Sequence, residues 1–129
     1  MFRWLEKAIN KSRTTVITAP GALKIHNVEA KFRSASNERR SPYGKLSQDR
    51  WNDGQERFSL TLRNLPNSHG GKVRLLTEGN LVAEFDVSGS TLKFQWKGYS
   101  SENIPLIAIG DRVTIEAGST VLSAIVEAD

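Results

Sequence analysis

The chain has 129 residues, with 18 lysines and arginines, 14 acidic residues and no cysteine. This length fits one domain with its own hydrophobic core. The lack of cysteine excludes a disulfide scaffold, a cysteine zinc site and a thiol nucleophile. No run of 18 apolar residues occurs in the sequence, which excludes a transmembrane helix.

Positive charge is concentrated in the first part of the chain. Residues 1–50 contain 11 lysines and arginines against 4 acids, a net charge of +7, whereas residues 51–129 contain 7 against 10, a net charge of −3. This asymmetry favours an anionic partner for the first half, which could be nucleic acid, a membrane surface or an acidic protein face. The alternative is a charge that serves only solubility.

Residues 1–21 are expected to form an N-terminal arm and linker. Within this arm, residues 2–11 have the pattern of a short amphipathic helix. Ten residues are too few for a stable isolated helix, so it must dock on its own domain, on a neighbouring subunit or on a lipid surface. Its apolar face comprises Phe2, Trp4, Leu5 and Ile9, and its polar face includes Arg3.

Residues 22–129 are expected to form a single all-β domain. Apolar and polar residues alternate in short stretches that are separated by turn residues such as Asn52-Asp53-Gly54. About eight short strands at this spacing predict an antiparallel β-sandwich or a small barrel of seven to eight strands. The expected strands cover residues from about 24 to 33, 43–51, 58–63, 73–77, 81–87, 91–97, 112–117 and 121–127, and residues 98–105 are expected to form a loop that contains Tyr99.

Residues 43–129 carry a succession of turn and core motifs: a glycine-led strand from Gly44, an Asp-Gly hairpin, the stretch 58–66, Ser88-Gly89, and the stretch 110–115 after Ile104-Pro105. In this order the motifs resemble small bacterial all-β modules of unknown function of the chordin-like repeat type. The resemblance covers about two-thirds of the chain. It implies a sandwich and carries over no catalytic residue.

No catalytic or cofactor motif is recognisable in the sequence. His26 and His69 have no second ligand at metal-binding spacing. Gly70-Gly71-Lys72 lacks the remainder of a phosphate-binding loop, and no nucleophile elbow is present. We therefore expect a protein that is not an enzyme, with no catalytic residue, metal, cofactor or small-molecule substrate.

The segment 39–51 interleaves basic and aromatic residues. Single-stranded nucleic acid binders use this mixture for phosphates and bases, and protein interfaces also favour arginine, tyrosine and tryptophan. A hairpin in which the tryptophan belongs to the core is the alternative. The residues concerned are Arg39, Arg40, Tyr43, Lys45, Arg50 and Trp51.

The sequence favours a non-enzymatic structural or protein-interaction module in a homo- or hetero-oligomeric assembly. The arm and the basic-aromatic segment 39–51 would contact neighbouring subunits. Two alternatives remain: a nucleic-acid-binding module that uses the basic first half, and peripheral attachment to a membrane through the N-terminal helix. Without a recognisable signal peptide, a cytoplasmic location is the default expectation.

Overall fold

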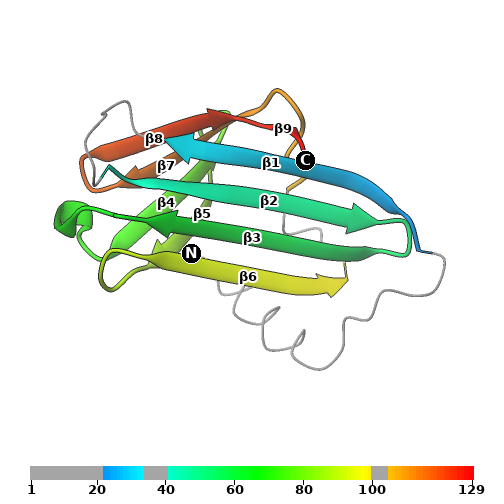
Figure 1. Cartoon of the computed structure of the whole chain (residues 1–129), viewed down its shortest axis with the longest axis horizontal. Helices are drawn as coiled ribbons and strands as arrows, with labels where there is room; N and C mark the ends of the chain where they lie inside the picture. The colour runs from blue at the N-terminus through cyan, green and yellow to red at the C-terminus, as the bar shows by residue number, and fades with distance from the viewer. Residues whose placement is uncertain (1–21, 34–40, 100–104) are drawn as a thin grey trace.

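The computed structural model describes residues 22–33, 41–99 and 105–129. These residues form two antiparallel β-sheets that pack face to face, so the expected all-β sandwich architecture is confirmed (Figure 1). The helix expected over residues 2–11 lies outside the described residues. Within the described ranges, no helix has the length and apolar character needed to cross a bilayer.

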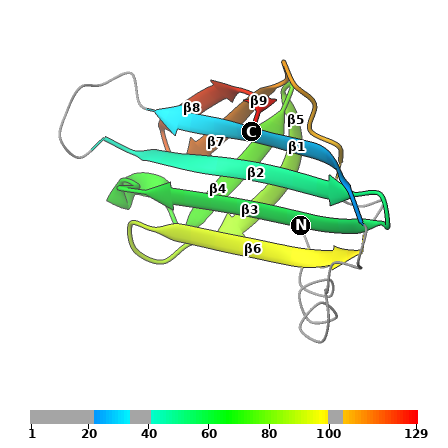
Figure 2. The same ribbon diagram turned by 45° about the vertical axis from the view of Figure 1, so that its right-hand side comes forward.

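One sheet has five strands in the order β6-β3-β2-β1-β9, and the other has four in the order β5-β4-β7-β8. Figure 2 shows the four-stranded sheet crossing obliquely behind the five-stranded one. The strands are β1 (Lys24–Arg33), β2 (Tyr43–Trp51), β3 (Gln55–Arg63), β4 (Lys72–Thr77), β5 (Asn80–Asp86), β6 (Leu92–Tyr99), β7 (Arg112–Ala117), β8 (Thr120–Ile125) and β9 (Glu127–Ala128), and one short 3-10 helix spans Asn67–His69.

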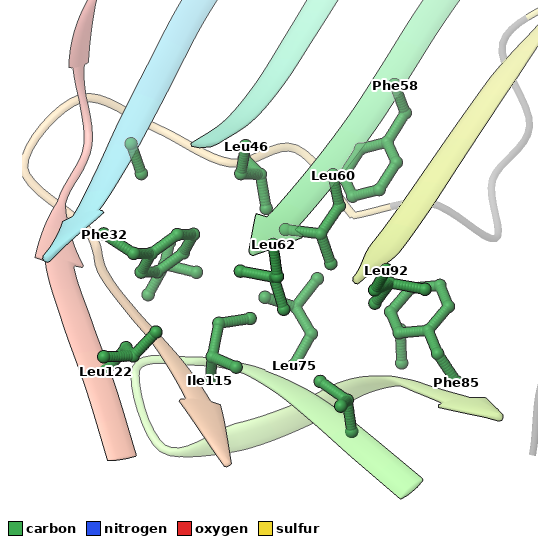
Figure 3. Close-up of a cluster of buried hydrophobic side chains, with 14 of the residues drawn as sticks. Phe32, Leu46, Phe58, Leu60, Leu62, Leu75, Phe85, Leu92, Ile115 and Leu122 are labelled. Atoms are coloured by element: carbon green, nitrogen blue, oxygen red, sulfur yellow. The ribbon is translucent and has the colours of Figure 1, made fainter. Parts of the chain in front are cut away.

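The core lies between the two sheets because alternate residues of each strand point inward. In β3, the buried Phe58, Leu60 and Leu62 alternate with Ser59 and Thr61, as the sequence pattern predicts. Figure 3 shows how side chains from both sheets meet. The labelled core residues are Phe32, Leu46, Phe58, Leu60, Leu62, Leu75, Phe85, Leu92, Ile115 and Leu122.

Tight turns connect the hairpins where the sequence predicts them. Gly54, with φ of 93°, closes the turn between β2 and β3. Glu78 and Gly79 have φ of 50° and 80° between β4 and β5. Positive φ at both central residues is typical of the two-residue turns that match the twist of paired strands.

Two strand predictions need correction. The stretch 121–127 was expected as one strand, but β8 ends at Ile125, the buried Val126 crosses between the sheets, and β9 pairs with β1 in the other sheet. Tyr99 was expected in a loop, but it is the last residue of β6 and lies opposite Gln55. The described residues therefore contain nine strands.

Candidate functional site

The outward-facing residues of β1, β2, β3 and β6 form a surface that we call the basic face. Strand pairing aligns their side chains in rows across the sheet, and each row lies two residues from the next. Within the described part of the chain, this face carries eight cationic side chains: Lys24, Lys31, Arg33, Lys45, Arg57, Arg63, Lys93 and Lys97.

One carboxylate of this face, Glu29, sits beside two lysines. Its Oε2 lies 2.7 Å from Lys45 Nζ, and its Oε1 lies 3.5 Å from Lys31 Nζ. The hydrogen bond from Lys45 lowers the pKa of Glu29 below its ordinary value, and the same contact raises the pKa of Lys45. Both groups therefore stay ionised at neutral pH, and Glu29 offsets one of the two lysine charges.

The second carboxylate, Asp49, neutralises the opposite end of the face. Its Oδ2 accepts a hydrogen bond of 2.6 Å from Arg57 Nη2, and Lys24 Nζ lies 3.9 Å from its Oδ1. The same two cations flank Trp51, with Lys24 at 5.2 Å and Arg57 at 5.5 Å from the ring centroid. The Trp51 ring is therefore held in a cation–π arrangement and is half-buried on the outward side. Glu127 and Asp129 add further acids at the β9 edge.

Four exposed cations of the basic face have no carboxylate oxygen within 4 Å among the residues that the structure describes. Arg33 and Arg63 lie on either side of Tyr43, and Lys93 and Lys97 lie on the edge strand β6. Their charges are free to attract an anion from solution.

The outward face of the four-stranded sheet is different because its charges balance. Lys72, Arg74 and Arg112 face outward there, together with Glu84, Asp86 and Glu116. Lys72 Nζ lies 2.6 Å from Asp86 Oδ1, and Arg74 lies between Glu84 and Glu116 at 3.8 and 3.7 Å. The excess of unpaired positive charge in the described strands therefore belongs to the five-stranded sheet.

Exposed aromatic rings share the basic face. The side chains of Tyr43 and Tyr99 are 49% and 59% exposed, at opposite ends of the face. Trp51 lies on the same side of the sheet as Tyr43, because an even number of residues separates them along β2. Aromatic rings beside unpaired cations are the composition that recognition surfaces favour.

A shallow pocket of about 440 Å³ opens on the basic face where β1 ends and β2 begins, the left-hand end of these strands in Figure 1. Its described lining is mainly apolar and includes no acid. The lining residues are Lys31, Phe32, Arg33, Tyr43, Gly44, Lys45, Thr61 and Arg63.

The inner face of the same sheet holds a buried polar cluster. Gln48 donates to the Pro105 carbonyl at 3.0 Å and accepts from the Ile107 backbone N–H at 2.9 Å. Arg50 Nε lies 2.7 Å from Glu56 Oε1 in an ion pair. Burial raises the pKa of Glu56, although Arg50 and Gln48 act in the opposite direction. The cluster anchors the segment after residue 104 to the sheet.

The structure brings together part of the predicted partner-binding set. Tyr43, Lys45 and Trp51 share the basic face, whereas Arg50 points to the opposite side of the sheet and pairs with Glu56. The remaining predicted residues, Phe2, Arg3, Trp4, Leu5, Ile9, Arg39 and Arg40, lie outside the described residues.

Sequence reasoning missed the cations that β3 and β6 contribute to this face. Arg57 and Arg63 stand at outward positions of β3, and Lys93 and Lys97 do so on β6. The sequence does contain a pattern that could have predicted them: in each of these strands the two cations lie an even number of positions apart and alternate with apolar residues. That pattern places each residue outward, but it does not show that the two strands are neighbours.

The histidines have structural contacts. His26 Nε2 lies 2.8 Å from the Ile107 carbonyl, and His69 Nε2 lies 2.8 Å from the Gly89 carbonyl. In the described ranges, no three histidine, aspartate or glutamate side chains come close enough together to hold a metal ion.

Comparison with family models, with curated proteins and with solved structures finds no match to this chain.

Proposed function

We propose that this chain is a non-enzymatic interaction module that binds an acidic protein partner through its basic face. The observation that carries the proposal is the group of cations on one sheet that have no carboxylate within 4 Å among the described residues, set against the balanced charges on the other sheet. Electrostatic complementarity of this kind steers association and sets orientation. The exposed tyrosines Tyr43 and Tyr99 would supply contact area that charge alone does not give.

Poly-L-glutamate is the first probe for this proposal, and its affinity for the full chain can be measured by calorimetry at low and high salt. Lys97→Glu should weaken binding, because it reverses an unpaired charge on the basic face. The matched control is Arg112→Glu, which reverses an exposed strand cation on the other sheet. Equal losses from the two variants, or binding that salt does not weaken, would contradict the proposal.

A second candidate, single-stranded nucleic acid, is favoured by the rings on the basic face. Tyr43, Trp51 and Tyr99 offer surfaces on which bases could stack beside cations. An oligothymidylate competing with poly-L-glutamate for the full chain separates the two candidates. An oligonucleotide that binds more tightly than the polypeptide at every salt concentration would favour the nucleic-acid function.

The partner could be another copy of this chain, because the first 50 residues carry a net charge of +7 and the remainder −3. The proposal assigns a contact role to the arm residues Phe2, Trp4, Leu5 and Ile9. Light scattering of the full chain and of a chain lacking residues 1–12 tests it. Loss of an oligomer in the shortened chain would support the role of the arm, and an unchanged molar mass would remove it. Membrane attachment through the arm is tested by adding anionic vesicles to the same two proteins.

A further inference from the structure

We propose that the pocket between β1, β2 and β3 binds a phosphotyrosine side chain that the protein partner presents. This inference rests on the proposed function, because it identifies the group that the basic face would recognise most tightly. Three features carry it: the cations around the pocket, its mainly apolar lining, and the absence of acids among the described residues of that lining.

The strand register gathers four cations around the pocket. Arg33 and Arg63 flank Tyr43 in one row, and Lys31 lies directly opposite Lys45 in the next. Because neighbouring strands lie about 4.8 Å apart, the backbones of β1 and β3 are about 10 Å apart, and the two rows are about 7 Å apart along the strands. A phosphate between Arg33 and Arg63 would meet two side chains that no described carboxylate holds, whereas Lys31 and Lys45 contact Glu29 and would have to turn from it to reach the phosphate.

This arrangement is unfavourable without an anion. Like charges directly opposite each other on neighbouring strands repel, and Lys31 and Lys45 form such a pair. Glu29 relieves that pair in part, but Arg33 and Arg63 have no carboxylate within 4 Å among the described residues. A phosphate monoester carries close to two negative charges and accepts several charge-assisted hydrogen bonds, so it supplies what the group lacks.

The pocket has more room than a phosphate alone requires. Its volume of about 440 Å³ falls in the range of sites for small organic groups. The half-exposed Tyr43 ring contributes apolar surface, together with the aliphatic stems of the cations around the pocket. A phosphate on an aromatic ring therefore fits better than a phosphate on a short aliphatic side chain, because its ring can pack against Tyr43.

A single phosphate fits this face better than a continuous phosphodiester strand. A strand running along β2 from the pocket towards Trp51 would pass Glu29 in the third row and Asp49 in the fourth. Both carboxylates would repel its phosphates. Arg33 and Arg63, which have no carboxylate partner in the described part of the chain, instead concentrate positive charge at one end of the face.

The test uses the full chain and short peptides in which two glutamates flank each side of a central residue. The central residue is phosphotyrosine, tyrosine or phosphoserine, and affinity is measured by calorimetry at one ionic strength. The phosphotyrosine peptide should bind about tenfold more tightly than the tyrosine peptide and more tightly than the phosphoserine peptide. Tyr43→Leu should abolish the preference for phosphotyrosine over phosphoserine.

Two variants that remove one charge each localise the effect. Arg63→Gln should remove most of the gain from phosphorylation, whereas Lys97→Gln should leave that gain unchanged. The control position lies opposite Arg57 on the same face, about 20 Å along the strands from Arg63. Both replaced residues are exposed, so thermal unfolding should show folded variants.

The outcomes separate this inference from the proposed function. If tyrosine and phosphotyrosine peptides bind equally and Lys97→Glu weakens both, the pocket assignment fails and the interaction module stands. If no peptide binds, both fail. If an eight-residue oligothymidylate binds but the phosphotyrosine peptide does not, the inference is overturned in favour of nucleic acid.

Discussion

Single residues in this fold meet strict local requirements, and Gly44 is the clearest case. A Cβ atom at this position would lie 2.1 Å from the Thr61 carbonyl oxygen and 2.6 Å from Leu62 Cδ2. The backbone oxygen cannot move aside without disturbing the pairing of β2 with β3. Gly44 is therefore required by close packing between strands.

Gly44→Ala should lower the free energy of unfolding by about 1–3 kcal/mol, because the added methyl group overpacks the strand pair. Urea denaturation monitored by circular dichroism measures the change. Gln95→Ala, at an exposed position of the same sheet, is the control and should stay within about 0.5 kcal/mol of the parent. Equal stability of the Gly44→Ala protein and the parent would show that the two strands can separate at this point without cost.

The buried Glu56 makes a pH-dependent contribution to stability. Burial raises its pKa above the ordinary value of 4.5, so the folded state holds the proton more tightly than the unfolded state does. Its contribution is fully present below the unfolded pKa and is lost as pH rises through the raised folded pKa. Glu56→Gln removes this titration.

The unfolding free energy of Glu56→Gln relative to the parent should therefore increase as pH rises from about 4.5 towards neutrality. Denaturation of both proteins at several pH values gives this difference directly. The contributions of the other titrating groups cancel in it, because both proteins share them. A difference that is constant with pH would show that the ion pair with Arg50 cancels the desolvation of Glu56, and one that falls as pH rises would show that the ion pair outweighs it.

At the scale of strands, alternation of apolar residues has a direct energetic consequence. Leu60 is fully buried between the sheets, and its neighbour Thr61 faces outward and is half-buried. Leu60→Ala should cost about 2–5 kcal/mol of unfolding free energy, because it leaves a cavity. Thr61→Ala should cost less than about 1 kcal/mol. Comparable losses in the two denaturation curves would contradict the assignment of inner and outer faces in β3.

Alternation also explains how much of the fold could be predicted. The limits of β2 and the inward set of β3 could be predicted because a period of two ties each residue to one face. The crossing at Val126 could not, because an unbroken apolar pattern through residues 121–127 does not show that the chain changes sheets. Pairing partners depend on long-range packing, which the local pattern does not contain.

The candidate site shows the same division between local and long-range information. Tyr43, Lys45 and Trp51 come from one strand, and their common face follows from their spacing. Arg63 and Lys97 join them only because the strand order is β6-β3-β2-β1. Arg50 was grouped with them because composition does not distinguish the two sides of a strand, and its place beside Glu56 depends on the register of β2 with β3.

At the scale of the whole molecule, the sandwich separates two surfaces of different charge. The described strands of the five-stranded sheet present four cations with no described carboxylate within 4 Å, whereas those of the four-stranded sheet present three cations and three acids, with Lys72 and Arg74 in ion pairs. The net charge of +4 therefore understates how basic one side of the molecule is. Association guided by this asymmetry should be oriented and should weaken as salt rises.

The role of the basic face in recognition can be tested by NMR, with backbone amide shifts measured while poly-L-glutamate is added to the full chain. Binding at this face should change shifts in β1, β2, β3 and β6, most strongly near Arg33 and Arg63, and added salt should reverse the changes. Changes centred on β4, β5, β7 and β8, or none at a polyglutamate concentration that binds, would show that the basic face is not the recognition surface.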